Sequence, residues 1–320
     1  MMENSGGTGY PRALVFGEAL WDLLPSGPVL GGASLNFAYR LGSLGVPTAL
    51  VTQVGTDELG KRAIEQMKAL GMEMRFVTQS RDLPTGTVPI ELDELRNPNY
   101  IIVPDVAYDA VPWTEDLRQA AAASEILCFG TLAQRDERSR STVRRMVDAF
   151  GGRTILTDIN LRPKCYTEET VRWSLEHGTI AKLNDEEIVE IAGMYGLAGR
   201  TVVEVAAALC REAALSIVVV TLGAHGALAV TSEGEQVVVP GFSVELNDPC
   251  GAGDAFAGAF VASIEAGTRL EEALTRANAL GALVASQPGA TQTITEEEIN
   301  HLVKDGARAV PPDPVLEFKR

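Results

Sequence analysis

The sequence contains few of the residues that build metal centres and covalent cross-links. Its 320 residues include four cysteines and three histidines, which are dispersed and form no CxxC pair. A zinc site or a disulfide framework therefore has no support in the spacing. Hydrophobic residues, by contrast, make up 46% of the chain. This is ample material for a large core, which excludes a disordered chain and a small disulfide scaffold.

Positive charge is also scarce. Lys and Arg number 27 against 43 Asp and Glu, which leaves a formal net charge of −16. Such a chain is repelled by nucleic acid and by anionic membrane surfaces, so neither is expected as a partner. The apolar run Ala13–Leu30 is interrupted by Glu18 and Asp22, and the first residues show no basic-then-apolar signal pattern. The sequence therefore predicts a cytoplasmic protein with no membrane span.

Short apolar runs alternate with helical periodicity along most of the chain. Strands are expected at Ala13–Gly17, Ala49–Val54, Ile126–Gly130, Thr154–Asp158 and Ile217–Thr221, with an antiparallel pair at Gly226–Thr231 and Gln236–Val239. Helices are expected at Ser34–Gly45, Asp57–Leu70, Glu137–Ala149, Val202–Glu212, Gly253–Ala266 and Leu270–Ser286. This order predicts an α/β fold in which a mostly parallel sheet carries helices on both faces.

One stretch interrupts the alternation. Thr85–Leu92 and Tyr100–Val103 are predicted to be strands joined by the polar turn Asp93–Asn99, with no helix between them. The pattern indicates a hairpin inserted into the α/β domain, and we expect it to act as a lid. Its exposed strand edges could be covered by a second subunit, so a homodimer through the lid is expected.

The clearest chemical signal is the segment from Asp248 to Asp254, which opens a helix. Gly251, Ala252 and Gly253 let successive backbone N–H groups turn inward at the positive end of that helix, which creates a pocket for an anion. A carboxylate beside bound phosphate is unfavourable unless it has a chemical task. We therefore expect Asp254 to remove a proton from an attacking hydroxyl group during phosphoryl transfer. The alternative is that Asp254 only caps the helix.

A second glycine pair, Gly31 and Gly32, precedes the helix that contains Asn36. It could be a tight turn with Ser34 as the helix cap, or a place where the backbone approaches a ligand while Asn36 offers a donor and an acceptor to a polyol. Just upstream, the run from Gly17 to Asp22 is predicted to end a strand at the carboxyl edge of the sheet, where ligands bind in open α/β folds. Asp22 is the expected sugar ligand there, in preference to Glu18.

These two glycine motifs resemble the two signatures of the ribokinase-like (PfkB) carbohydrate kinase family. Further segments follow in the family's order: Thr85-Gly86, Asp158–Arg162, Asn184–Glu187, Thr221–Gly223 and Gly289-Ala290. The resemblance spans nearly the whole chain. It implies one kinase domain over residues 1–320, with a three-layer α/β/α fold, a mostly parallel central sheet and a small β-strand lid formed near residues 22–32 and 85–110. It also implies transfer of the γ-phosphoryl group of ATP, with Mg²⁺, to a hydroxymethyl group of a monosaccharide.

The resemblance further implies a role for individual residues. Asp254 would be the catalytic base, and Gly251, Ala252 and Gly253 the anion hole. The implied sugar ligands are Asp22, Gly31, Gly32, Asn36, Thr85, Gly86 and Arg162. The implied nucleotide-binding residues are Asn160, Asn184, Thr221, Gly223, Gly226, Gly251, Gly253, Asn278 and Ala282.

Two residues are implied for ions. Glu187 would organise Mg²⁺ through water, although an acidic N-terminus of a helix is the alternative explanation of the Asn184–Glu187 motif. Asp248 would help to bind a monovalent cation such as K⁺. Pro249 and Cys250 stand where the family commonly has two threonines, which leaves the K⁺ requirement open. Cys250 is either a thiol activated by the anion hole or an inert one.

Several runs, among them Gly17–Pro25 and Phe129–Arg135, are most similar to bacterial fructokinases, so fructose is the expected substrate. The alternatives are 2-keto-3-deoxygluconate, whose carboxylate Arg96 or Arg135 could bind, and ribose; a nucleoside finds little aromatic support beyond Tyr100. A catalytically idle sugar or nucleotide sensor on the same fold is the non-enzymatic alternative, although base and anion hole are both present. A dehydrogenase is disfavoured, because no GxGxxG motif follows the first strand.

Overall fold

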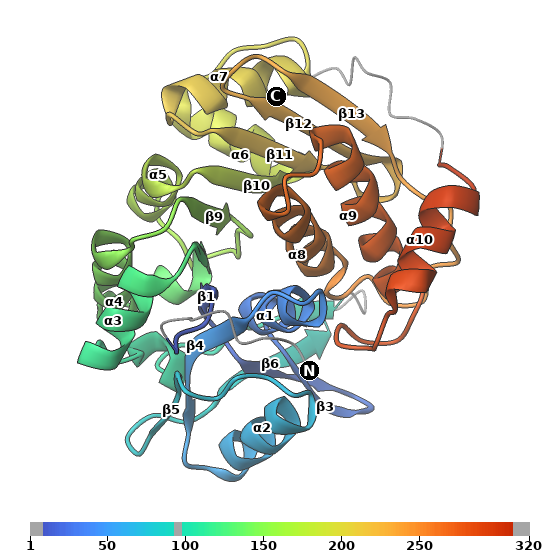
Figure 1. Cartoon of the computed structure of the whole chain (residues 1–320). Coiled ribbons are helices and arrows are strands. Elements are labelled where there is room, and N and C mark those ends of the chain that lie inside the picture. The colour runs from blue at the N-terminus through green and yellow to red at the C-terminus, as the bar shows by residue number, and fades with distance from the viewer. Residues whose placement is uncertain (1–8, 93–97, 310–320) are drawn as a thin grey trace.

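The computed structural model describes residues 9–92 and 98–309. Its main body is a nine-stranded sheet in the order β13-β12-β11-β10-β9-β8-β1-β4-β5, and a four-stranded sheet in the order β3-β2-β6-β7 lies beside it (Figure 1). The strands of the large sheet are β1 (Ala13–Phe16), β4 (Thr48–Gly55), β5 (Val77–Ser80), β8 (Ile126–Gly130), β9 (Thr154–Asp158), β10 (Ile180–Asn184), β11 (Ile217–Thr221), β12 (Gly226–Thr231) and β13 (Gln236–Pro240). All neighbours from β5 to β11 pair in parallel, whereas β12 and β13 are antiparallel.

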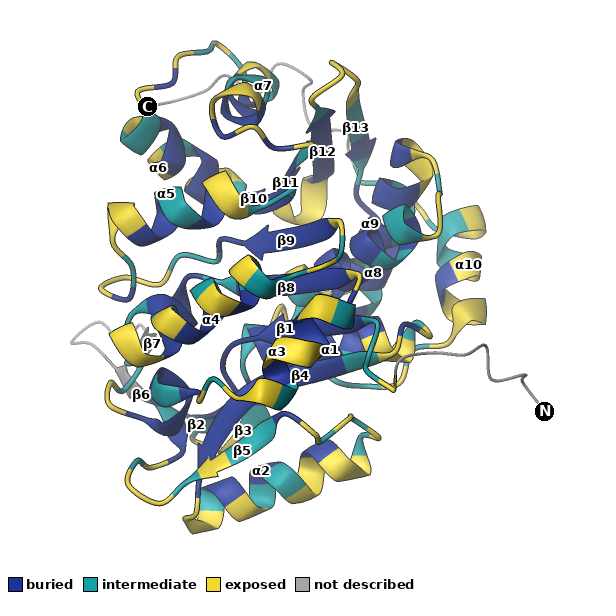
Figure 2. Cartoon of the chain, turned by 60° about the vertical axis from the view of Figure 1, so that its left-hand side comes forward, coloured by how far each residue is buried: buried dark blue, intermediate teal, exposed yellow. Residues whose placement is uncertain are grey.

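Helices cover both faces of the large sheet. One apolar core lies under α1 (Ala33–Ser43), α2 (Glu58–Ala69), α8 (Ala252–Glu265), α9 (Leu270–Ala285) and α10 (Glu296–Asp305). Two further cores lie on the opposite face, under α3 (Glu115–Ala123), α4 (Glu137–Ala149), α5 (Glu168–His177), α6 (Asp185–Tyr195) and α7 (Val202–Glu212). The strands in the middle of the large sheet are buried, while the helices turn exposed faces outward (Figure 2). The predicted three-layer α/β/α fold is confirmed, since apolar strands of this kind need cover on both sides.

The small sheet joins two distant parts of the chain. Its strands are β2 (Leu20–Leu24), β3 (Gly27–Gly31), β6 (Gly86–Leu92) and β7 (Pro98–Tyr100). β2 pairs with β3 antiparallel and with β6 parallel, and β6 and β7 form the expected hairpin. The predicted turn of that hairpin lies, for residues 93–97, outside the described residues.

Two details of this sheet differ from the prediction. The run Gly17–Asp22 does not end a strand of the central sheet: β1 ends at Phe16, and Asp22 lies within β2. Gly17 permits the exit, because a Cβ atom there would lie 1.9 Å from the Ser34 hydroxyl oxygen. The second hairpin strand ends at Tyr100 and not at Val103, where the Arg135 guanidinium takes up the Val103 carbonyl oxygen (2.7 Å).

The helices and the potential metal ligands of the described residues bear on membrane insertion and metal binding. Among the helices of the described ranges, none combines the length and the apolar character that a bilayer crossing needs. Nor does the described part of the chain gather three or more His, Cys, Asp or Glu side chains into a metal cluster. The four cysteines are free, as the spacing predicts.

Candidate active site

The two glycine signatures meet in space. Asn36 in α1 donates from Nδ2 to Oδ2 of Asp254 in α8 at 2.9 Å, across 218 residues of sequence. The two helices approach closely because α8 presents Gly258 to α1, where an added Cβ would lie 3.1 Å from the Arg40 Cβ. A larger side chain at Gly258 would separate the helices and the contact between Asn36 and Asp254 with them.

The surroundings of Asp254 tune it for proton transfer. Burial raises the pKa of its carboxyl group to about 7, and the negative charges of Asp158 and Glu18 act in the same direction. The hydrogen bond from Asn36 and the positive charge of Lys182 oppose this rise but do not cancel it. A carboxylate with a pKa near 7 is a strong base that is still substantially ionised at neutral pH, which suits a general base.

The turn before Asp254 has the geometry of an anion pocket. Gly251 has a φ of 77°, and a Cβ atom there would lie 2.3 Å from the Ala290 Cβ, so only glycine fits. The Ala252 amide donates to the Pro249 carbonyl oxygen. The amides of Gly253 and Asp254 find no acceptor among the described residues, so two donors remain at the positive end of α8.

Asp248 holds this turn in place. Its Oδ1 accepts from the Cys250 amide (2.9 Å) and its Oδ2 from the Gly289 amide (3.0 Å). The carboxylate thereby joins the anion pocket to the segment that contains Gly289. The cation-binding role of Asp248 stays a prediction, whereas its bracing role is visible in the hydrogen bonds.

Cys250 belongs to the same turn. Desolvation raises the pKa of its thiol to about 11, with further contributions from the carboxylates of Asp22, Asp248 and Asp254. The thiol is therefore protonated at neutral pH, which favours the inert alternative over the activated one.

Two of the predicted sugar ligands, Asp22 and Gly31, lie next to each other. Asp22 Oδ2 would lie 3.0 Å from a Cβ on Gly31, so the carboxylate stands directly over the glycine pair. Burial raises the pKa of Asp22, the positive charge of Arg162 lowers it, and the negative charge of Asp248 raises it further. Gly32 has a φ of 112° and no room for a Cβ, which would lie 2.7 Å from the Glu18 carbonyl oxygen.

Asn36, another predicted sugar ligand, has an incomplete set of hydrogen bonds. Its side chain is buried, and its Oδ1 has no hydrogen-bond partner among the described residues, while its Nδ2 is committed to Asp254. A buried acceptor without a partner is costly, so a donor from a ligand is expected there. A sugar hydroxyl group can provide one.

Thr85 and Gly86 lie where the lid joins the body. The Thr85 hydroxyl donates to Asp57 Oδ1 (2.7 Å) and accepts from the Gly55 amide (2.9 Å), and its own amide donates to Asp57 Oδ2 (2.7 Å). A Cβ on Gly86 would lie 2.5 Å from a ring carbon of Tyr108. These contacts anchor the start of β6 to the body of the protein, and direct contact of Thr85 and Gly86 with a sugar stays a prediction.

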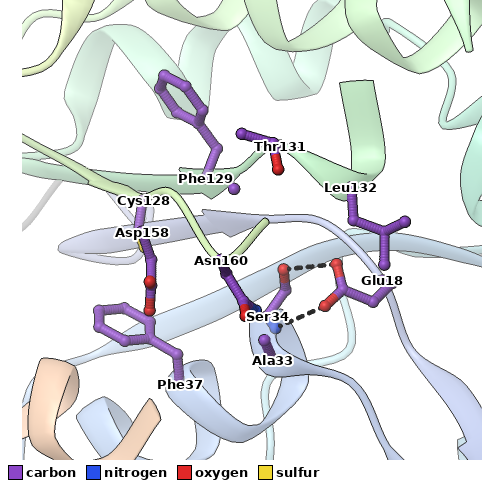
Figure 3. Close-up of a pocket in the computed structure, with 11 residues that line it drawn as sticks. Glu18, Ala33, Ser34, Phe37, Cys128, Phe129, Thr131, Leu132, Asp158 and Asn160 are labelled. Carbon is purple, nitrogen blue, oxygen red and sulfur yellow. Dashed lines mark hydrogen bonds between the residues drawn. The ribbon is translucent and has the colours of Figure 1, made fainter. Parts of the chain in front are cut away.

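A small cavity lies at the start of α1, where Ala33 and Ser34 line it (Figure 3). It has a volume of about 20 Å³, which is room for one water molecule. Glu18 accepts from the Ser34 amide (3.2 Å) and hydroxyl group (3.0 Å) at one side, and Asp158 and Asn160 line the other. Glu18 therefore stabilises the start of α1. Asn160, which has a φ of 41°, lines the cavity.

The Asn184–Glu187 motif is a helix cap. The Asn184 side chain accepts from the amides of Glu186 and Glu187, and Glu187 Oε2 in turn accepts from the Asn184 amide (2.8 Å). The other Glu187 oxygen accepts from the Leu161 amide (2.8 Å). Both oxygens of this buried carboxylate are thus engaged, so it suits Mg²⁺ only through bridging water, the mode in which Mg²⁺ is commonly held beside phosphates.

The remaining predicted nucleotide residues lie on neighbouring elements. Thr221 at the end of β11 pairs in register with Asn184. Gly226 cannot carry a Cβ, which would lie 2.1 Å from the Val239 carbonyl oxygen, and Asn278 donates to that same oxygen (3.3 Å). Gly223 has a φ of 56°, and Ala282 packs against the core. Their contact with a nucleotide stays a prediction.

Sequence reasoning missed Lys182. This buried lysine in β10 stands opposite Asp158 of β9, and its Nζ lies 2.9 Å from Asp158 Oδ1. A charged residue inside an otherwise apolar strand was the available signal, because lysine is almost never buried unless it is paired. Asp158 belongs to the segment Asp158–Arg162, but the sequence assigns it no role.

Comparisons with known proteins place most of the chain in one family. A model described as pfkB family carbohydrate kinase matches residues 28–297. A fructokinase of Escherichia coli is 28% identical over 297 residues, which cover 87% of this chain and 94% of the relative. An aminoimidazole riboside kinase of Salmonella typhimurium is 28% identical over 300 residues, or 87% and 90% of the two chains.

The fold has close structural neighbours as well. The crystal structure of a fructokinase with bound ATP from Xylella fastidiosa has a TM-score of 0.81 to this chain. The match covers 92% of this chain and 99% of the other at 21% sequence identity, so it carries the fold alone. The family match extends over most of the length and includes both signatures that meet at Asp254. The chain belongs to the pfkB family of carbohydrate kinases and is a phosphotransferase that acts on a sugar.

Proposed function

We propose that this kinase transfers the γ-phosphoryl group of ATP to a hydroxymethyl group of fructose. The observation that carries the proposal is the hydrogen bond between Asn36 and Asp254, which joins the helices that follow the two glycine motifs at a carboxyl group with a pKa of about 7. The use of ATP is supported by the bound nucleotide in the Xylella fastidiosa fructokinase.

The chemistry assigned to the residues is a direct displacement. Asp22 and the free Oδ1 of Asn36 accept hydrogen bonds from sugar hydroxyl groups and orient the reacting one. Asp254 takes the proton of that hydroxyl as its oxygen forms a bond to phosphorus, and the bond from phosphorus to the nucleotide breaks. The unpaired amides of Gly253 and Asp254 stabilise the negative charge on the phosphoryl oxygens during transfer.

Mg²⁺ fits this arrangement as an ion held by the phosphates and by water. Glu187 is the residue that would hold one of those waters, because both its oxygens already accept from backbone amides. When bound, the ion supplies positive charge that neutralises the phosphates. The K⁺ site at Asp248 and a homodimer through the lid remain predictions.

Arg135 supports fructose over a sugar acid. It makes a bidentate pair with Asp109, at 2.8 Å from both Nε and Nη2, and it also donates to the Tyr108 hydroxyl group (3.0 Å). Burial opposes its charge, but the bonds to Asp109 raise the pKa of Arg135 overall. It is therefore fully used within the protein and is not free to bind a substrate carboxylate. Arg96, the other expected partner of such a carboxylate, lies outside the described residues.

The runner-up substrate is 2-keto-3-deoxygluconate. Arg162 is exposed, and its positive charge acts on Asp22, so it could pair with a sugar acid. A relative named 2-dehydro-3-deoxygluconokinase from Bacillus subtilis is 27% identical over 280 residues, close to the 28% of the Escherichia coli fructokinase. The identities thus do not discriminate, and the choice of fructose depends on the internal use of Arg135.

A substrate panel tests the proposal. Fructose, 2-keto-3-deoxygluconate, ribose and adenosine are compared at fixed Mg-ATP by a coupled assay of ADP release. We expect the highest kcat/KM for fructose; a higher value for another acceptor would replace fructose as the substrate.

The catalytic base is tested by Asp254→Asn, with the exposed Asp148→Asn as the matched control. We expect kcat to fall by about 10²–10⁴, the usual contribution of general base catalysis, with the KM for sugar changed by less than about threefold. Turnover retained in Asp254→Asn would remove this residue from the mechanism.

A further inference from the structure

Lys182 occupies a position where the alternation of β10 directs it toward the catalytic helix. Ile180 packs into the core under α1, α8 and α9, whereas Ala181 and Leu183 pack into the core on the opposite face. Because side chains alternate along a strand, Lys182 shares the face of Ile180. Its long side chain therefore runs toward the N-terminus of α8.

The contacts of the ammonium group are incomplete. Lys182 Nζ donates to Asp158 Oδ1 at 2.9 Å, and this is the single hydrogen bond that it makes within the described ranges. An ammonium group has three N–H donors, so two remain. The side chain is only 9% exposed, which means that water satisfies these donors poorly.

Lys182 also lies beside the anion pocket. A Cβ placed on Gly253 would be 3.7 Å from Lys182 Nζ and 3.9 Å from its Cε. The amide of Gly253 is one of the two donors left open at the start of α8. The free ammonium donors and the free amides thus border the same space.

The charges around this space explain why a cation is retained there. Burial lowers the pKa of Lys182, but the carboxylates of Asp158, Glu187 and Asp254 outweigh burial and the pKa is raised, so the side chain stays charged. One ammonium group faces three carboxylates. Without it, a phosphoryl group with its own negative charges would enter a strongly repulsive site.

We propose that Lys182 is a catalytic residue whose two unpaired N–H donors bind an oxygen of the phosphoryl group while that group passes from the nucleotide to the sugar. This inference rests on the proposed function. The sugar oxygen forms the new bond to phosphorus, its proton goes to Asp254, and the electrons of the broken phosphorus–oxygen bond leave with the nucleotide. Lys182 remains protonated throughout and returns unchanged.

The competing explanation is a structural ion pair that only joins β9 to β10. The two explanations differ in what happens when both charges are removed. If the pair is only structural, replacing both partners with neutral side chains leaves neither of their charges buried without its partner. Folding and activity should then recover. A lysine that binds the transferred group cannot be replaced in this way.

The experiment compares wild type with Lys182→Met, Asp158→Asn and the double variant, with the exposed Lys61→Met as a control. Urea unfolding reports folding, and steady-state kinetics report kcat and KM separately. Affinity for ADP is measured alone and with aluminium fluoride, which mimics the phosphoryl group in transfer. The double variant also guards against loss of folding in Lys182→Met, because it removes both charges of the Lys182–Asp158 pair together.

We expect kcat of the double variant to stay about 10²–10³ below wild type, the loss typical of one donor to the transition state, with the KM for sugar changed less than about threefold. The affinity for ADP with aluminium fluoride should fall at least about tenfold while that for ADP alone is unchanged. Recovery of kcat in the double variant to within tenfold of wild type, or equal loss of both affinities, would overturn the role of Lys182. A wild-type chain that phosphorylates no acceptor of the panel would instead overturn the proposed function and this inference with it.

Discussion

The hydrogen bond from Asn36 to Asp254 should set the pH at which the enzyme works. Asn36 Nδ2 stabilises the ionised form of Asp254, whose pKa is about 7. Asn36→Leu keeps a similar volume and removes the donor. Without it the ionised carboxylate is less favoured, so the pKa of Asp254 rises above its wild-type value.

The size of this shift follows from the strength of the bond. A hydrogen bond to a charged group contributes about 1.5–3 kcal/mol, and each pKa unit corresponds to about 1.4 kcal/mol, so we expect a rise of about 1–2 units. With a rise of about 1.5 units, the ionised fraction of Asp254 at pH 7 falls from about one half to about 3%, which lowers kcat about 15-fold. The loss should disappear at a pH above about 9.

The assay is kcat as a function of pH at saturating sugar and Mg-ATP. Saturation matters because Asn36 also borders the sugar, and a weakened KM would otherwise obscure the effect. The matched control is Ser43→Ala, which removes an exposed hydroxyl group bonded to the Arg40 carbonyl oxygen at the end of the same helix. An acidic limb in Asn36→Leu that coincides with wild type, or moves to lower pH, would refute this account of Asp254.

Three further outcomes are expected. Gly251→Ala should lower kcat at least about 100-fold and destabilise the protein by about 1–3 kcal/mol in urea unfolding, because the new Cβ meets Ala290 at 2.3 Å; wild-type values would show that the turn adapts. Arg135→Met should cost about 3–5 kcal/mol of stability by leaving Asp109 buried and unpaired, with no change in the preference among sugars; a selective loss of 2-keto-3-deoxygluconate activity would restore Arg135 as a substrate ligand. Sugar should slow hydrogen exchange in the lid strands β2 and β6 while α10 is unchanged, and equal exchange with and without sugar would contradict lid closure.

Much of the scaffold was predictable from local patterns. The strands Ile126–Gly130 and Thr154–Asp158 and the helix Glu137–Ala149 have the predicted bounds, because apolar runs and helical periodicity are local signals. β2 was missed, since Leu20–Leu24 follows β1 so closely that the two read as one strand. Its partner β6 lies more than sixty residues away in the sequence, and no local signal reports that pairing.

The candidate site shows the same division. Asp254 and Gly251 were predictable because a tight turn at a helix start leaves a compact motif. The engagement of the Thr85 hydroxyl with Asp57 could not be foreseen, since it depends on how the lid meets the body. Lys182 needed the register of β9 and β10, which places it opposite Asp158.

The contact between Asn36 and Asp254 also has a consequence for biosynthesis. Its two partners are separated by 218 residues, so a chain emerging from the ribosome completes most of its sheet before the second partner exists. No amino-terminal fragment that stops short of α8 can assemble the reaction centre, however well its strands are folded. The reaction centre is therefore completed late in synthesis, and turnover shows that α1 and α8 have packed together.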